Sequence, residues 1–156
     1  MIYILSIGTN IGNRKENIEK VIDSINLLPK TKVNKVSSIY ETQPVGFDDQ
    51  QNFYNICVEV ESSFNPHEML GCALGIEAGF GRIRTIKNGP RIIDIDIILS
   101  DCGNVNSENL LIPHPRYKER RFVLEPLKEL YPSCSVFGND FSGLSEKIEN
   151  QKIIKL

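Results

Sequence analysis

The chain has 156 residues, enough for one domain with a substantial apolar core, and we expect residues 1–156 to form a single domain. A formal net charge of −2 argues against a protein that coats nucleic acid or an anionic membrane, so we expect no nucleic-acid or membrane partner and only local anion sites. The four cysteines are widely spaced and no apolar run approaches the roughly 20 residues of a membrane span, so we expect free thiols in a cytoplasmic protein.

The first 62 residues predict three strands and one helix. Residues 1–9 are apolar and alternate as a strand, and apolar residues recur at helical spacing over residues 14–28. Residues 31–41 are rich in β-branched side chains and run into a polar loop that contains proline and glycine. Strict alternation over residues 52–62 predicts a strand with one apolar face.

A second helix is predicted to begin after Asn65 and to run to about Phe80. Asn65 suits the N-cap, Pro66 suits the first helical position, and Glu68 is placed to complete a capping box. A basic, glycine-flanked loop follows, and residues 91–99 predict a fourth strand. The order strand, helix, strand, strand, helix, strand predicts an α+β, ferredoxin-like split βαβ fold, in which an antiparallel sheet carries both helices on one face.

The remaining segments are interpreted as connections and C-terminal additions. The stretch “GTNIGN” at residues 8–13 lacks the Gly-Lys-Ser/Thr sequence that supplies the lysine and the magnesium-binding hydroxyl of a phosphate-binding loop, so it predicts a strand-to-helix turn capped by Asn13. Beyond residue 100 we expect a hairpin, a helix around residues 118–130 and a last helix near residues 142–150.

The stretch “GPRIIDIDIIL”, residues 89–99, carries two acids within an apolar strand. Alternation gives a helix-facing set and an outward set of side chains. The helix-facing set is Ile93, Ile95, Ile97 and Leu99, and the outward set is Ile92, Asp94, Asp96 and Ile98. Like charges about 6.5–7 Å apart on one face repel unless a cation lies between them, and Mg²⁺ prefers carboxylate oxygens. The pair predicts a magnesium site open to phosphate, with a solvated strand face as the alternative.

Two basic groups flank this strand. Fixed cations beside a metal site suit a polyphosphate, because they neutralise its charge during transfer. For each group alone, a solvated face or a partner-binding patch is the alternative. His114, beside the second group, is interpreted as either a phosphate contact or a structural residue. The first group is Arg82, Arg84, Lys87 and Arg91, and the second is Arg116, Lys118, Arg120 and Arg121.

Phe53 and Asn55 are predicted on the face of their strand that points away from the helices. An aromatic ring in that place packs on a flat ligand or beneath a layer formed by residues 101–156, and both interpretations stay open. Asn55 offers a donor and an acceptor, as the edge of a heterocycle requires. Together with the acids and the basic groups, these residues predict a site for a nucleotide phosphate and a flat organic group.

Several stretches spaced along the chain, taken together and in order, are similar to one known family. They are “YILSIGTNIGNR” at the start, “SSIYETQPVG”, “FYN” and “GRIR” in the middle, “KNGPRIIDIDII” at residues 87–98 and “IPHPRYKERRFVLEPL” after it. In this order they resemble the 6-hydroxymethyl-7,8-dihydropterin pyrophosphokinase family, whose signature is similar to residues 87–98. The resemblance implies a magnesium-dependent transferase of folate biosynthesis. Such an enzyme moves pyrophosphate from ATP to the pterin alcohol and yields AMP and the pterin diphosphate.

The resemblance implies a role for each matching residue. Asp94 and Asp96 would bind two Mg²⁺ ions that bridge the ATP phosphates. Arg82 and Arg91 would be catalytic, because they would stabilise charge as the pterin hydroxyl attacks the β-phosphorus. The expected ATP contacts are Glu77, Arg84, His114, Arg120 and the backbone around Ile97. The expected pterin contacts are Thr42, Pro44, Val45, Phe53, Asn55 and Phe122, with the two aromatic rings on either side of the pterin.

The resemblance also implies a monomer with small-molecule substrates, in which loops at residues 9–13, 43–51 and 81–90 cover the site. Three positions differ from residues found in some family members and bear on adenine packing and loop closure: Leu74, Asn88 and Pro115. A non-catalytic, ferredoxin-like module that binds a nucleotide or a pterin is the alternative from another functional class. That alternative gives no reason for two arginines to flank the acids.

Overall fold

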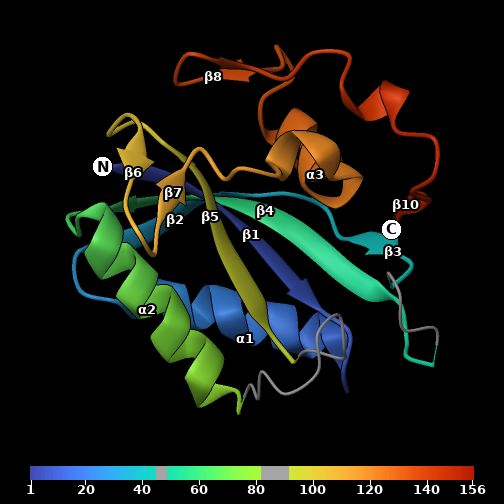
Figure 1. The fold of residues 1–156 in the computed structure, drawn as a ribbon. Coiled ribbons are helices and arrows are strands. Elements are labelled where there is room, and N and C mark those ends of the chain that lie inside the picture. Colours follow the sequence, from blue (N-terminus) through green and yellow to red (C-terminus); the bar gives the residue numbers. More distant parts are fainter. Residues whose placement is uncertain (45–48, 82–91) are drawn as a thin grey trace.

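A six-stranded antiparallel sheet with helices on both faces forms the body of the protein in this computed structural model (Figure 1). The structure describes residues 1–44, 49–81 and 92–156, and the elements below lie within them. The main elements are β1 (Ile2–Thr9), α1 (Arg14–Asn26), β2 (Thr31–Val36), β3 (Tyr40–Thr42), β4 (Phe53–Ser62), α2 (Pro66–Gly79), β5 (Asp94–Ser100), α3 (Arg121–Leu130) and β10 (Ile153–Lys155). The smaller ones are β6 (Val105–Asn106), β7 (Leu111–Ile112), η1 (Tyr117–Glu119), β8 (Ser135–Val136), β9 (Asn139–Asp140) and η2 (Ser145–Lys147).

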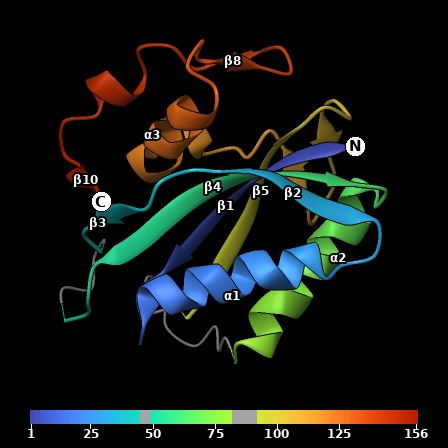
Figure 2. The same ribbon diagram turned by 180° about the vertical axis from the view of Figure 1, so that it is seen from behind.

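The strand order of the main sheet is β10-β3-β4-β1-β5, and β2 also pairs with β4. β2 and β3 lie one after the other along β4, with Val36 opposite Val58 and Tyr40 opposite Asn55. These pairings are antiparallel. Both α1 and α2 lie on one face of the sheet (Figure 2), so the predicted ferredoxin-like α+β fold is confirmed.

Both helices of this face begin where the sequence predicts. The side chain of Asn13 accepts a hydrogen bond from the N–H of Glu16, and Asn65 forms the reciprocal capping box with Glu68. These caps satisfy main-chain donors that the first helical turn leaves unpaired. α1 ends at Asn26, two residues before the predicted end.

The layer between the sheet and these two helices is one of two apolar cores. Alternation sends Ile7, Ile56 and Ile95 from three adjacent strands to this side, where each is at most 6% exposed. Val21 and Ile25 of α1 belong to the same cluster. Burial of each such side chain stabilises the fold by about 1.5–3 kcal/mol. The inward face therefore anchors the three strands and leaves their outward face available for other contacts.

α3 covers part of the outward face and closes the second core. Ile4, Cys57 and Ile98 of the sheet and Leu124 and Leu127 of α3 share one cluster in which all five side chains are inaccessible to solvent. Residues 101–156 therefore do form a third layer, one of the two interpretations left open for Phe53, on the side of the sheet opposite α1 and α2 (Figure 1).

The end of β5 departs from simple alternation. Leu5 lies opposite Ile97 and Ile4 lies opposite Leu99, so Ile98 is an extra residue in β5. This β-bulge brings both Ile98 and Leu99 into the core beneath α3. The prediction that Leu99 shares a face with Ile97 is therefore wrong.

The C-terminal region contains less helix than predicted. α3 begins at Arg121 rather than near residue 118, because the backbone of Arg120 is extended and the separate turn η1 precedes it. The helix predicted near residues 142–150 is wrong, since this described stretch contains only the 3₁₀ turn η2. Gly143 has a φ of 71°, which an α-helix does not accommodate. The hairpin expected after residue 100 is formed by β6 and β7.

The cysteines and the helices test two expectations drawn from the composition, namely free thiols and no membrane span. All four cysteines are free thiols, as predicted, and Cys57 is buried. Among the residues that the structure describes, none of the helices combines the length and the apolar character that crossing a membrane requires.

Glu129 on α3 ties this helix to the edge of the sheet. Its carboxylate accepts hydrogen bonds of 2.7 Å from the N–H of Ser38 and from the hydroxyl of Tyr40, and Lys155 of β10 lies 3.5 Å away. Burial raises the pKa of Glu129, but the hydrogen bonds and Lys155 outweigh burial and hold the pKa below its usual value.

We expect Glu129 to stabilise the fold at neutral pH and to lose this effect in acid. A carboxyl whose pKa is lower in the folded than in the unfolded chain stabilises the fold above its unfolded pKa, and the effect disappears as the pH falls through the folded pKa. The difference in free energy of unfolding between the wild type and Glu129→Gln, measured by urea denaturation, should be largest at about pH 7 and shrink toward about pH 3. A difference independent of pH would contradict this interpretation.

Candidate active site

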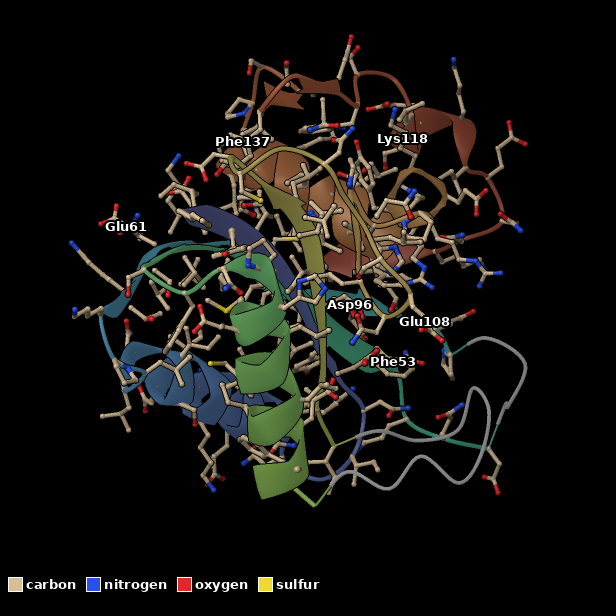
Figure 3. All side chains as sticks on the ribbon, turned by 60° about the vertical axis from the view of Figure 1, so that its left-hand side comes forward. Phe53, Glu61, Asp96, Glu108, Lys118 and Phe137 are labelled. Atoms are coloured by element: carbon tan, nitrogen blue, oxygen red, sulfur yellow. The ribbon has the colours of Figure 1, made fainter. Side chains whose placement is uncertain are left out.

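A pocket of about 420 Å³ opens on the outward face of the sheet, beside the N-terminal end of α3. Figure 3 shows the side chains of Phe53 and Asp96 on the side of the sheet away from α2. The pocket is lined by Ser6, Gly8, Thr42, Gln43, Pro44, Phe53, Asn55, Asp94, Asp96, Arg116, Glu119, Arg120, Arg121, Phe122, Asn150, Gln151 and Lys152. It therefore brings together residues predicted to bind phosphate and magnesium, residues predicted to bind the pterin, and a C-terminal segment that the sequence did not indicate.

Two small residues of the central strand β1 form the floor of the pocket. Gly8 lies between Asp94 of β5 and Asn55 of β4, and Ser6 lies beside Asp96. A Cβ atom on Gly8 would lie only 2.9 Å from Oδ1 of Asn55, closer than such atoms normally approach. A side chain in this row would fill the space between the acids and Asn55, so the pocket depends on glycine at position 8.

Asn55 is held in one orientation at the bottom of the pocket. Its side chain is buried, with the residue only 4% exposed, and Nδ2 donates a 2.9 Å hydrogen bond to Oγ1 of Thr42 on β3. A buried amide fixed in this way presents a defined pattern of hydrogen-bonding groups rather than a rotating one. Phe53, Phe122 and Pro44 add apolar surface to the same pocket. This part of the site suits a flat heterocycle with a polar edge.

Asp94 and Asp96 point into the pocket from β5, and both are half-buried. The guanidinium of Arg120 lies 3.7 Å from Oδ2 of Asp96. The prediction that the two acids face away from α1 and α2 is confirmed. The described residues contain no group of three or more acids, histidines and cysteines close enough to hold a metal ion. Two carboxylates on one face of a strand match Mg²⁺, which prefers carboxylate oxygens and keeps water or phosphate oxygens as its other ligands.

Glu77 supports the strand that carries the two acids. Glu77 is only 3% exposed. Its Oε2 accepts a 2.8 Å hydrogen bond from the N–H of Ile95, the residue between Asp94 and Asp96. β5 is the last strand in the sheet order, so this carboxylate binds the main chain of an edge strand. The contact between Glu77 and ATP expected from the family resemblance stays a prediction, and so does the adenine contact of the backbone at Ile97.

His114 lies against β5 near the acids. The main-chain N–H of His114 donates a 2.9 Å hydrogen bond to the carbonyl of Ile98. The ring atom Nδ1 accepts one of 3.1 Å from the main-chain N–H of Arg116. Burial and the positive charge of Arg120 lower the pKa of His114, and Asp94 opposes them only in part. The imidazole is therefore neutral at pH 7, so it can donate a hydrogen bond to a phosphate oxygen without adding a charge.

Two loops expected to cover the site are connected to each other. The side chain of Asn10 donates hydrogen bonds to Oε1 of Gln50 at 2.7 Å and to the carbonyl of Gln51 at 3.1 Å. Gln51 in turn donates to the carbonyl of Gly12 at 3.3 Å. The turn after β1 and the segment before β4 are thereby joined, so a displacement of one would carry the other with it.

Four of the predicted site residues lie outside the described residues. They are Arg82, Arg84, Arg91 and Val45. Lys87 and most of the loop expected at residues 81–90 also fall there, so the first basic group stays a prediction. The second basic group contributes Arg116, Arg120 and Arg121 to the pocket.

The sequence interpretation missed the pocket floor and the C-terminal wall. Gly8, two positions after Ser6 in the first strand, was a usable signal, because a glycine inside a strand often marks a place that a ligand or another backbone approaches closely. Asn150, Gln151 and Lys152 carry no such signal. They are 28 residues or more beyond Phe122 in the chain, and only the path of the tail brings them to the site.

Comparisons with known proteins identify relatives of this chain. The family described as “7,8-dihydro-6-hydroxymethylpterin-pyrophosphokinase (HPPK)” matches residues 4–132. A 2-amino-4-hydroxy-6-hydroxymethyldihydropteridine pyrophosphokinase of Bacillus subtilis (strain 168) is 43% identical over 129 residues, which cover 83% of this chain and 77% of that protein. A protein of the same name from Methylorubrum extorquens is 37% identical over 134 residues, covering 86% of this chain and 85% of that protein.

Solved structures show the same fold. The crystal structure of Plasmodium falciparum HPPK-DHPS wild type with pterin and p-hydroxybenzoate matches with a TM-score of 0.68 and 19% sequence identity. The match covers 94% of this chain but only 42% of that chain, so this chain spans less than half the length of the solved protein. At this identity the likeness concerns the fold alone.

We expect Gly8→Ala to destabilise the protein, because the new Cβ would displace Asn55 from its place beside Thr42. The expected loss in free energy of unfolding is about 1–3 kcal/mol, the usual cost of overpacking a close contact. Chemical denaturation monitored by circular dichroism would measure it.

The matched control is Gly75→Ala on the exposed side of α2, where a Cβ would meet nothing within 4 Å. This change should stabilise the protein by about 0.5–1 kcal/mol, because alanine favours a helix over glycine. The two substitutions should therefore have opposite signs. Equal effects at both positions would show that the approach between Gly8 and Asn55 is not restrictive.

Proposed function

Because the chain belongs to the 7,8-dihydro-6-hydroxymethylpterin-pyrophosphokinase family, it transfers pyrophosphate from ATP to 6-hydroxymethyl-7,8-dihydropterin in folate synthesis, and we propose that this transfer takes place in the pocket between β1, β5 and α3. The products would be AMP and the pterin diphosphate. One observation carries the proposal: a single pocket holds the fixed amide of Asn55 and the paired carboxylates of Asp94 and Asp96.

We propose that the pterin binds at the Asn55 end of the pocket. Asn55 would recognise the polar edge of the heterocycle, and the hydrogen bond to Thr42 would keep the amide from turning. Phe53 and Phe122 would contact the two faces of the ring, with Pro44 and Val45 completing the apolar surround. This arrangement would direct the hydroxymethyl group of the pterin toward the acids on β5.

The triphosphate of ATP would lie at the Asp94 and Asp96 end. The carboxylate oxygens of these residues are of the kind that holds Mg²⁺, and we propose two such ions. When bound, Mg²⁺ would neutralise phosphate charge and align the β-phosphorus with the attacking hydroxyl. Arg120, already at the acids, would pair with phosphate oxygens, and neutral His114 would donate a hydrogen bond to them.

Arg82 and Arg91 are proposed as the catalytic arginines that stabilise the charge of the pyrophosphoryl group during displacement, with Arg84 as an ATP contact. The displacement would be direct: the pterin hydroxyl would replace AMP at the β-phosphorus, and no covalent enzyme intermediate would form. Glu77 would act on the same step by holding β5, and thus both acids, in place. The connected loops at Asn10 and Gln50 would exclude water, which competes with the pterin hydroxyl for the activated phosphorus.

We also propose that the chain acts as a cytoplasmic monomer in which residues 1–156 form one domain. The two apolar cores share the same sheet, which supports a single folding unit for the described residues. Size-exclusion chromatography with light scattering would give one chain per particle if the monomer is correct.

Mixing the protein with ATP, magnesium and 6-hydroxymethyl-7,8-dihydropterin should yield AMP and the pterin diphosphate in equal amounts. Chromatography of the nucleotides distinguishes this reaction from ordinary phosphate transfer, which would yield ADP. Binding of the pterin without turnover would instead favour a non-catalytic ligand-binding module.

Asp96→Asn and Asp94→Asn should each reduce turnover by more than about a hundredfold while pterin binding changes little, because the amide cannot replace a charged magnesium ligand. Turnover at saturating substrates and calorimetric titration with the pterin would separate the two effects. Asp23→Asn, on the exposed side of α1, is the matched control and should turn over normally. Normal rates in the β5 variants, or in wild type freed of metal by chelation, would exclude the proposed metal site.

A further inference from the structure

The C-terminal tail forms a wall of the pocket. After η2 the chain runs down beside α3 to the sheet edge, where β10 pairs with β3 (Figure 2). Between these two elements, Asn150, Gln151 and Lys152 line the pocket that also contains Phe53 and Phe122. The family match ends at residue 132, so these residues lie beyond the region that the family comparison covers.

Gln151 is the point at which the tail is attached to the start of α3. Its Oε1 accepts a 2.9 Å hydrogen bond from the N–H of Arg121, and its Nε2 donates one of 3.0 Å to the carbonyl of Glu119. Its own carbonyl accepts a third, 2.9 Å long, from Nη1 of Arg121. Both ends of the side-chain amide and the main-chain oxygen are therefore used on residues 119–121.

These bonds replace a cap that α3 lacks. Arg120 occupies the N-cap position and makes no side-chain capping hydrogen bond, so the first N–H of the helix, at Arg121, depends on Gln151. The next residue is Phe122, whose ring lies in the pocket and 5.5 Å from the guanidinium of Arg120. A shift of the first turn of α3 would move the ring of Phe122 directly.

The other end of the tail is attached to the opposite wall. In the pairing of β10 with β3, Ile153 lies opposite Thr42, the residue that binds Asn55. The main chain of Leu156 also donates to the carbonyl of Ile39 at 2.9 Å. Residues 151–153 therefore connect the wall that carries Phe122 to the wall that carries Thr42.

Resting on the function proposed above, we propose that Gln151 is a positioning residue for the pterin: it caps α3 from the tail and thereby sets the distance between the ring of Phe122 and the opposite wall of Phe53 and Asn55. Arg120 is joined to Asp96 by an ion pair of 3.7 Å, and no residue of the tail takes part in that pair. Gln151 therefore acts mainly on pterin affinity and less on the nucleotide.

The test compares Gln151→Leu, which removes both side-chain hydrogen bonds at similar size, with Gln151→Glu, which keeps the acceptor for the N–H of Arg121 and loses the donor. Calorimetric titration with 6-hydroxymethyl-7,8-dihydropterin, in the presence of magnesium and a nonhydrolysable ATP analogue, gives the pterin Kd. Gln151→Leu should raise this Kd about five- to tenfold, and Gln151→Glu should raise it less. In turnover assays the rise should fall on the KM for pterin, with a smaller change in the KM for ATP.

Ile154→Ala is the control in the same tail, because this side chain is 61% exposed on β10. It should leave the pterin Kd within about twofold of wild type, which excludes a general effect of tail substitutions. The proposal is overturned if Gln151→Leu binds the pterin like wild type, or if it weakens the ATP analogue as much as the pterin. Absence of AMP formation by the wild type would instead count against the proposed function, since pterin binding is measured separately.

Discussion

The alternation of side-chain direction along β1, β4 and β5 is the constraint on which the site depends. It sends Ile7, Ile56 and Ile95 toward α1 and α2, and it sends Gly8, Asn55 and Asp94 the other way in one row across the three strands. The inward isoleucines make a change of register costly, because a slip of one residue would exchange the two faces. Packing on one side of the sheet thus fixes the positions of polar groups on the other side.

Those polar groups form an arrangement that would be unfavourable without support. Two carboxylates share one face of β5, and the amide of Asn55 is buried. Each is held by a neighbour from a different element: Glu77 binds the main chain between the acids, Arg120 pairs with Asp96, and Thr42 accepts from Asn55. Because the supports come from α2, the start of α3 and β3, the fold itself positions these described groups of the pocket. Preorganised groups of this kind need little rearrangement when charge moves in the transition state.

Local sequence patterns were sufficient to predict the main helices and strands, and to predict which residues of β4 and β5 line the pocket. Periodicity and capping residues predicted α1, α2 and the four strands of the ferredoxin-like core, and alternation put Asp94, Asp96, Phe53 and Asn55 on the outward face. Contacts between distant segments were not predictable in this way. The capping of α3 by Gln151 joins residues 30 positions apart and involves an unremarkable glutamine. The prediction of a helix near residues 142–150 was wrong for a local reason. The backbone of Gly143 is left-handed, and the periodicity of the side chains did not indicate this.

The extra residue at Ile98 gives β5 two phases in one strand. Before it, the outward positions are occupied by the acids of the pocket, and after it two consecutive side chains, Ile98 and Leu99, enter the core beneath α3. Within the seven residues of β5, the bulge therefore separates the side chains that line the pocket from those that pack in the core beneath α3. During divergence of such a chain, the apolar layer beneath α3 could be rebuilt with larger or smaller residues without turning the two acids out of the pocket. The two ends of β5 are therefore free to evolve at different rates.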